Sequence, residues 1–334
     1  MALRVGATLL LTAACLAWVL SGVDLGAAWQ TLRGMGWGWM LGVQALYLAA
    51  HALRVARFRL LLDQEDARKT TFGGLFSIVS VGYLAIHVVP FRMGEFVRPW
   101  LLREKAGVEL GAGLAAIVVE RILDMVMLLA MLLVVGLVVD LPSGVVIQGI
   151  DVLRAGQRVA GVLVGAGVMT LTALAMAGER LLVRTDRLPG GHLVRHFVRA
   201  TRTLVANPVR GGAALALSIL IWALTIEAVR QSMAAFPGLP SDALAALTTW
   251  ALTLAGMTAV PTPGFFGGYE AACTTILGLL KVEPTPAGAF AFLLHVGQFG
   301  FTLVLGIGCL VREGLDLRSI VAASRDAVRT SPAP

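Results

Sequence analysis

Residues 111–139 read GAGLAAIVVERILDMVMLLAMLLVVGLVV, an apolar run of membrane-spanning length that contains Glu120, Arg121 and Asp124. Glu120 and Asp124 are four residues apart, so they share one helix face with Arg121 beside them. A charge near the bilayer centre costs at least about 2.5–3.5 kcal/mol, so such groups should face a partner or a cavity. The three residues therefore indicate a functional site, a buried ion pair that fixes helix packing, or a position near the cytoplasmic interface.

The rest of the chain has the same character. Of its 334 residues 57% are hydrophobic and 14% are charged, against about 25% charged in a soluble domain. Apolar runs long enough to span also occur near 5–23, 37–55, 158–178, 209–229 and 287–311. We therefore expect an all-α integral membrane protein with six transmembrane helices, in which residues 1–334 form one polytopic domain.

Basic residues predict the orientation. Arginine and lysine gather in 54–69, 180–207 and 312–334, whereas 24–36, 140–157 and 230–243 hold few of them. Because cytoplasmic loops carry the basic residues, we expect a multi-pass protein of the bacterial cytoplasmic (inner) membrane with both termini in the cytoplasm. Segment 180–207 is then a cytoplasmic linker and 312–334 a cytoplasmic tail. The same rule accounts for the formal net charge of +7, so no nucleic-acid partner is expected.

Two further apolar segments, 72–90 and 244–260, are each broken by proline and glycine and then followed by a glutamate. The basic loops keep their side of the membrane only if 72–108 enters and returns from the cytoplasm, and 244–280 from the periplasm. We therefore predict two re-entrant hairpins. The unit of span, hairpin and span occurs in 37–139 and, in the opposite orientation, in 209–311, which is an inverted-topology repeat.

The two hairpin tips have similar sequences. Residues 89–95 read VPFRMGE and residues 260–270 read VPTPGFFGGYE. Non-helical backbone at membrane depth persists only where it is buried in protein or lines a wet cavity, so matching breaks in two halves point to a central site. Chance similarity between two short turns is the alternative. The backbone residues that define the tips are Pro90, Gly94, Pro261, Pro263, Gly264 and Gly267.

The tips also carry charges. Arg92, Glu95 and Arg98 lie beside the first break, where freed backbone amides and two arginines can hold a lipid phosphate; a plain interfacial loop is the alternative. Glu270 follows the second break and would either carry a proton or accept hydrogen bonds from the amides of a helix N-terminus. Glu227 and Arg230, three residues apart, indicate a structural ion pair.

Other polar groups form a second tier of candidates. His295 and Gln298 share one face of the last span, where they would line a cavity or make a packing hydrogen bond. The three cysteines have neither metal-ligand nor disulfide spacing, and we expect no metal and no cofactor. The remaining second-tier residues are Arg57, His87 and Tyr269.

Taken in order, these motifs resemble the lysylphosphatidylglycerol synthase transmembrane-region family, in its form without an aminoacyltransferase domain. The residues that carry the resemblance are Arg57-Phe58-x-x-Leu61-Leu62, Pro90-x-Arg92-x-Gly94-Glu95-x-x-Arg98, Glu120-Arg121-x-x-Asp124 and Pro261-x-Pro263-Gly264-x-x-Gly267-x-x-Glu270. The resemblance implies a flippase-like region that moves lipid between leaflets. Two positions depart from the family pattern: Ile86-His87 stands where an asparagine is common, and Phe265 replaces a usual glycine.

We therefore expect translocation of a phospholipid or lipid-linked anionic substrate. Arginines 92, 98 and 121 would take the phosphate, while Glu95, Glu120, Asp124 and Glu270 would pair, orient or carry protons. The alternatives are a membrane enzyme acting on lipid-linked sugars or aminoacyl lipids, and a non-catalytic scaffold for an envelope enzyme. Expected partners are membrane lipids, with a lipid-modifying or glycosyltransferase enzyme as a candidate. The sequence contains no Walker A motif, so no ATP-driven cycle is expected.

Overall fold

The computed structural model describes residues 12, 14–34, 36–88, 94–139, 146–147, 150–151, 197–198, 201, 207–259 and 262–316, and these are almost entirely helical. Residues 14–21 are helical. The helices that follow are α2 (Leu25–Gly34), α3 (Gly38–Leu61), α4 (Gln64–Arg68), α5 (Phe72–Val88), α6 (Val97–Ala106) and α7 (Leu110–Val138). Two antiparallel two-residue strands, β1 (Val146–Ile147) and β2 (Ile150–Asp151), come next. The later helices are α11 (Pro208–Ala235), α12 (Ala243–Ala259), α13 (Gly268–Leu279) and α14 (Pro284–Arg312).

Three of the described helices, α7, α11 and α14, are long and apolar enough to cross a membrane. They contain 29, 28 and 29 residues, against about 20 needed to span, and they confirm the spans predicted near 111–139, 209–229 and 287–311. The chain is thus a multi-pass membrane protein. Helix α3 covers the predicted span 37–55 but is less apolar, because it includes Gln44, His51 and Arg54.

The count of six spans remains a prediction. Part of 5–23, all of 158–178, most of the linker 180–207 and most of the tail 312–334 lie outside the described residues.

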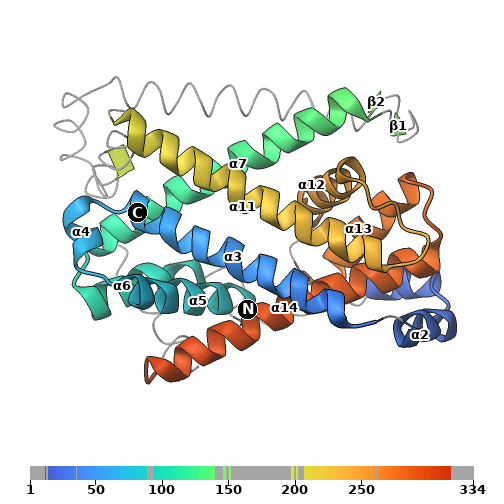
Figure 1. The fold of residues 1–334 in the computed structure, drawn as a ribbon, viewed down its shortest axis with the longest axis horizontal. Coiled ribbons are helices and arrows are strands. Elements are labelled where there is room, and N and C mark those ends of the chain that lie inside the picture. The colour runs from blue at the N-terminus through green and yellow to red at the C-terminus, as the bar shows by residue number, and fades with distance from the viewer. Residues whose placement is uncertain are drawn as a thin grey trace. The chain divides into compact units, whose positions relative to one another are not determined.

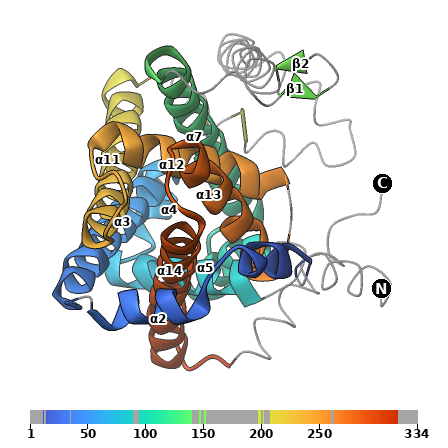
Figure 2. The same cartoon turned by 90° about the vertical axis from the view of Figure 1, so that its right-hand side faces the viewer.

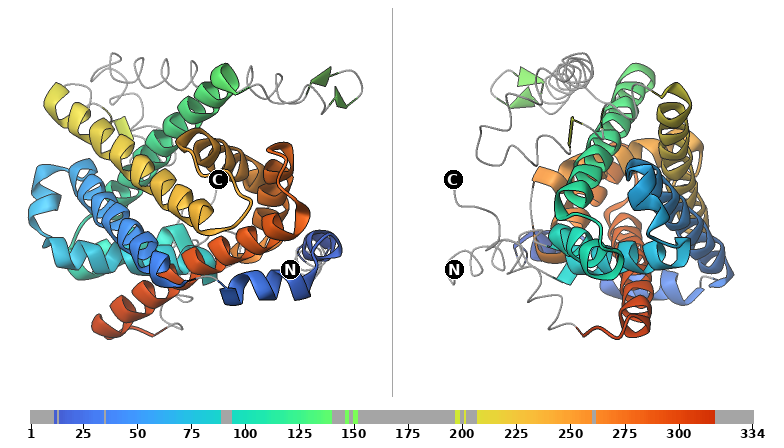
Figure 3. Two further views of the ribbon diagram at one scale, coloured as in Figure 1. Left: turned by 45° about the vertical axis from the view of Figure 1, so that its right-hand side comes forward. Right: turned by 90° about the vertical axis from the view of Figure 1, so that its left-hand side faces the viewer.

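Contacts divide the chain into two compact units, each assembled from separate stretches of sequence. Unit 1 comprises 1–50, 128–162 and 222–301, and unit 2 comprises 51–127, 163–221 and 302–334. The divisions fall inside α3, α7, α11 and α14, so each of these long helices contributes one part to each unit. The long helices can be followed in Figure 3, where α7 is green, α11 yellow and α14 red.

Each unit contains one of the two predicted hairpins. In unit 2, α5 and α6 pack side by side (Figure 1). In unit 1, α12 and α13 pack against each other (Figure 2). Helices α5 and α12 have 17 residues each, and α6 and α13 have 10 and 12, all short for a full crossing. Each segment is therefore observed as a pair of short packed helices, while their re-entry into the membrane stays a prediction.

The core of unit 2 lies around α5, which is buried on nearly all sides. Leu75, Val81 and Leu84 are fully or almost fully buried, together with Phe58 of α3 and Leu102 of α6. A helix that is apolar all round is expected in the interior of a protein rather than at its surface. The described part of unit 1 contains edge-to-face ring pairs, among them Trp39–Phe236 and Phe236–Phe290.

Gly94 sets how closely the two helices of the first hairpin approach. A Cβ atom at this position would overlap the backbone of Ala85 in the last turns of α5. We expect Gly94→Ala to lower the free energy of unfolding by about 1–3 kcal/mol, because backbone on one helix must then move. Unfolding of the purified protein in detergent, with tryptophan fluorescence as readout, measures this loss. Gly212→Ala in α11 is the matched control, since a Cβ there meets nothing within 4 Å; equal stability of the two variants would contradict the prediction.

Candidate functional site

Five charged residues of unit 2 come together from three helices, and we call them the arginine–carboxylate cluster. Glu120, Arg121 and Asp124 lie on α7, while Arg57 comes from α3 and Arg98 from α6. The spacing on α7 places Glu120 and Asp124 on one helix face, because residues four apart point the same way. Tertiary packing then brings a separate arginine from another helix to each of these carboxylates.

Arg98 and Glu120 form the most buried pair of the cluster. Their side chains are 2% and 1% exposed, and Arg98 Nη1 donates to both carboxylate oxygens of Glu120 at 3.1 and 3.0 Å. The guanidinium also lies 5.0 Å from the ring centres of Phe58 and Tyr83. A buried charge is tolerated only when it is paired and hydrogen-bonded, and this pair meets both conditions. From the sequence we predicted that Arg98 binds a lipid phosphate. In the structure its guanidinium is instead hydrogen-bonded to Glu120.

Arg57 pairs with the second carboxylate of α7. Its Nη2 lies 2.8 Å from Asp124 Oδ1, and its Nη1 donates to Ser218 Oγ of α11 at 2.9 Å. The Arg57 side chain is fully buried, whereas Asp124 keeps 20% of its side-chain surface exposed. The sequence ranked Arg57 in the second tier and did not indicate Ser218, whose hydroxyl also bonds to its own helix.

Arg121 is the most exposed member of the cluster. Its Nη2 donates to Glu120 Oε1 at 2.8 Å, its Nη1 is 3.6 Å from Asp124 Oδ2, and 40% of its side chain is exposed. Glu95, beside the first hairpin tip, interacts with it electrostatically. Two carboxylates thus hold Arg121 in place while part of its side chain stays exposed. Of the remaining first-hairpin candidates, Pro90 and Arg92 lie outside the described residues.

A second buried pair occurs in unit 1. Glu270 Oε1 lies 2.6 Å from His295 Nδ1, with side chains 1% and 7% exposed, and Glu270 Oε2 accepts a hydrogen bond from the Gly267 amide at 2.7 Å. His295 Nε2 lies 3.0 Å from the Gly264 carbonyl oxygen. Glu270 therefore accepts a hydrogen bond from an amide at the start of α13, as one sequence interpretation held. Pro261 lies outside the described residues, and Pro263 belongs to the 3₁₀ turn Pro263–Phe265.

The other second-tier residues make separate contacts. Gln298 Nε2 donates to the Tyr47 hydroxyl at 2.7 Å, which joins α14 to α3, and Tyr47 is a residue that the sequence did not indicate. Tyr269 stacks on His295 with ring centres 4.6 Å apart. His87 Nδ1 lies 2.8 Å from the carbonyl oxygen of Tyr83, within its own helix. Arg230 and Glu227 form the expected ion pair at 2.7 Å.

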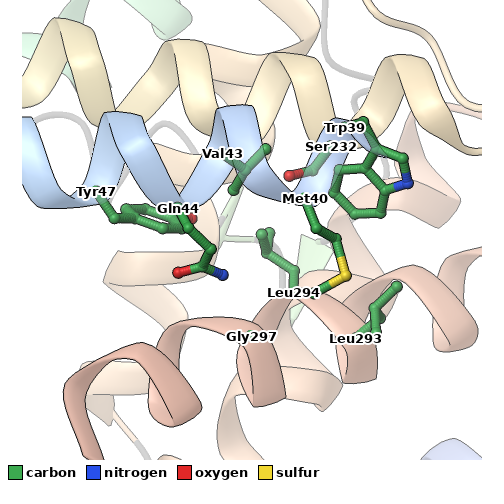
Figure 4. A pocket seen from close by; sticks show the side chains of 9 residues that line it. All are labelled: Trp39, Met40, Val43, Gln44, Tyr47, Ser232, Leu293, Leu294 and Gly297. Carbon is green, nitrogen blue, oxygen red and sulfur yellow. The ribbon is translucent and has the colours of Figure 1, made fainter. Parts of the chain in front are cut away.

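Unit 1 also contains a small pocket of about 10 Å³, which is room for about one water molecule (Figure 4). Trp39 Nε1 and Gln44 Oε1 are buried at its wall without a hydrogen-bond partner among the described residues. The indole N–H can donate and the amide oxygen can accept, so each atom suits a hydrogen bond with a water molecule. The lining residues are Trp39, Met40, Val43, Gln44, Tyr47, Ser232, Leu293, Leu294 and Gly297.

The chain has long apolar helices and two pairs of shorter packed helices, and it buries charged groups among them. These features define a polytopic membrane protein with charged groups inside its fold. It belongs to the lysylphosphatidylglycerol synthase TM region family, whose model matches residues 5–306. A curated relative is "Glycosyltransferase AglD" of Haloferax volcanii, which is 25% identical over 352 residues; the match covers 96% of this chain and 56% of the relative. The chain thus spans little more than half the length of that relative. No solved structure matches the chain.

Proposed function

We propose that this protein moves the anionic head group of a phospholipid or lipid-linked substrate between the two leaflets of its membrane. The observation that carries the proposal is the arginine–carboxylate cluster on α7, a helix of spanning length, with Arg121 partly exposed. Charges inside a membrane span are costly and typically mark a substrate or ion pathway. A lipid phosphate supplies the oxygen acceptors that a guanidinium binds through paired hydrogen bonds.

Within the cluster the residues have different tasks. Arg121 contacts the phosphate, because its Asp124 contact of 3.6 Å is longer than a hydrogen bond and its side chain is 40% exposed. Glu120 orients Arg121 and is itself fixed by Arg98, so the buried pair is a positioning element. Asp124 is fixed by Arg57 in the same way.

The hairpins supply the second element of the proposal. We propose that they are re-entrant from opposite faces and belong to an inverted-topology repeat, with both termini in the cytoplasm and the protein in a bacterial inner membrane. The occurrence of one hairpin in each unit, with parts of the same four long helices, supports this repeat. Alternating exposure of the cluster would carry the head group across while the lipid tails stay in the bilayer.

The relative named a glycosyltransferase favours a second candidate, a role in sugar transfer to or from a lipid-linked phosphate. Such a substrate presents the same phosphate to Arg121 but requires a reaction at the sugar. A partner glycosyltransferase, or a further catalytic group, would supply that reaction. Measuring sugar transfer beside head-group movement in the same vesicles separates the two candidates.

The test of the main proposal is head-group translocation in proteoliposomes with fluorescent anionic and aminoacylated lipids. We expect Arg121→Gln to slow translocation by about 10- to 100-fold, because hydrogen bonds to a charged group contribute roughly 1.5–3 kcal/mol. Arg121→Lys keeps the charge but loses the paired geometry, so its rate should be intermediate.

Arg230→Gln is the control for this test, because Arg230 forms an ion pair of which both side chains are more than one-third exposed. Its rate should match that of the unaltered protein. Absence of movement of any lipid by the folded unaltered protein, or an unchanged rate in Arg121→Gln, would refute the proposal.

A further inference from the structure

From the geometry of Glu270 and His295 we propose that this pair, the Glu–His dyad, is a proton-binding site. The bound proton holds the second hairpin in its observed conformation. Release and uptake of this proton couple head-group movement to a proton gradient. The coupling step rests on the proposed function, whereas proton binding rests on the dyad geometry alone.

The hydrogen-bond partners fix how many protons the dyad carries. A carbonyl oxygen can only accept, so the contact of 3.0 Å with Gly264 requires a hydrogen on His295 Nε2. The Gly267 amide donates to Glu270 Oε2, so that oxygen acts as an acceptor. Between His295 Nδ1 and Glu270 Oε1, 2.6 Å apart, one more proton is required to make a hydrogen bond. Whichever atom holds it, the dyad then has no net charge.

Burial makes this proton essential to the observed conformation. Without it, the imidazole keeps a single ring hydrogen, which can serve the contact with Glu270 or the contact with Gly264 but not both. A net negative charge would also remain on groups that are 1% and 7% exposed. The rings of Phe266 and Tyr269 lie 4.5 and 4.6 Å from the imidazole ring and keep the surroundings apolar. Loss of the proton should therefore break one of these two contacts of His295.

The dyad is placed to transmit that change to the hairpin backbone. His295, on α14, holds the Gly264 carbonyl in the turn before α13, and Glu270 holds the Gly267 amide three residues further along. Loss of either His295 contact thus weakens the attachment of the turn to α14. In the release step the N–H or O–H bond within the dyad breaks, its electron pair stays on the dyad, a water molecule takes the proton, and nothing is oxidised.

No lysine, arginine or further carboxylate among the described residues is placed in contact with the dyad, and its titratable neighbours are phenols and thiols. Tyr269 and Cys273 lie on α13, and Cys273 interacts electrostatically with Glu270. Tyr47 of α3 bonds to Gln298, three residues beyond His295 on α14. Cys15, in the helix of residues 14–21, approaches Gly267, and α12 contributes the neutral Thr253. The carboxylate and imidazole are therefore the groups expected to exchange a proton.

The experiment combines translocation under an imposed pH gradient with pH-difference infrared spectroscopy of the reconstituted protein carrying isotope-labelled histidine. One proton coupled to each transfer changes the leaflet ratio of the labelled lipid by up to about tenfold per pH unit of gradient. In the infrared spectra, a carboxyl band and a histidine band should change together at one pH.

Glu270→Gln is the decisive variant, because its amide group can donate to His295 Nδ1 while its oxygen accepts from Gly267, so the fold keeps both bonds. We expect it to lose the gradient response and the paired infrared change. His295→Gln should lose both as well. Glu227→Gln, at the partly exposed ion pair on α11, should retain both.

The outcomes separate the two proposals. Translocation that ignores the pH gradient, with no paired infrared change, overturns the inference and leaves the proposed function standing. A sodium gradient that drives transport in place of the pH gradient also overturns it. A paired infrared change without movement of any lipid upholds proton binding at the dyad and overturns the proposed function.

Discussion

Glu120→Ala is expected to lower the free energy of unfolding by about 3–5 kcal/mol, because it leaves the Arg98 guanidinium buried without its partner. Arg98 is 2% exposed and directs Nη1 to both oxygens of Glu120, so no water replaces the lost carboxylate. Arg121 loses its 2.8 Å contact at the same time. Unfolding in detergent, followed by tryptophan fluorescence against denaturant concentration, measures the change.

Two controls distinguish an unpaired buried charge from general damage to the fold. The double variant Arg98→Met with Glu120→Leu removes both charges and should recover most of the stability, since apolar replacement of a buried pair is often neutral or better. Glu227→Ala, at the partly exposed pair with Arg230, should change stability by less than about 1 kcal/mol. A double variant as unstable as Glu120→Ala would contradict this account.

Gly267→Ala is expected to cost about 2–5 kcal/mol, the sum of a backbone term and a packing term. Gly267 has φ of +82°, where a residue with a Cβ atom pays roughly 1–2 kcal/mol. A Cβ there would also lie 2.8 Å from the Thr12 carbonyl oxygen and 2.9 Å from Cys15 Cβ, which adds about 1–3 kcal/mol of overpacking. The same detergent unfolding experiment measures the loss.

The matched control is Gly278→Ala in α13, where a Cβ meets nothing within 4 Å and φ is not positive. It should match or exceed the stability of the unaltered protein, because alanine favours a helix more than glycine does. Equal losses at positions 267 and 278 would show that the turn does not impose the constraint described.

The sequence predicted the parts of the fold that rest on local pattern. Three long apolar runs became α7, α11 and α14, and the segments broken by proline and glycine became pairs of short packed helices. The shared face of Glu120 and Asp124 also follows from spacing alone. Six spans, re-entry and orientation stay predictions, since they concern the membrane or lie partly in residues outside those described.

Partner choice was harder to predict, because it depends on tertiary packing. Glu120 and Asp124 lie one helical turn apart on α7, yet the arginines that pair with them come from α6 and α3. The spacing of residues within α7 does not predict which other helix supplies a partner. Glu270 and His295 were both indicated, but they are 25 residues apart on different helices, so their pairing was not. Tyr47 was missed because the sequence pattern is the same whether an aromatic residue in a span makes a specific hydrogen bond or only packs against its neighbours.

The division of the long helices between the two units has a consequence for biosynthesis. Residues 284–301 of α14 belong to unit 1 and include His295, while its remaining residues belong to unit 2 and include Cys309 and Leu310 of that core. A nascent chain that has not yet delivered α14 to the membrane therefore leaves both units unfinished, with Glu270 lacking its histidine. Both units therefore complete their folds only after α14 has been synthesised, and a chain truncated before residue 284 should be recognised as incomplete by membrane quality control.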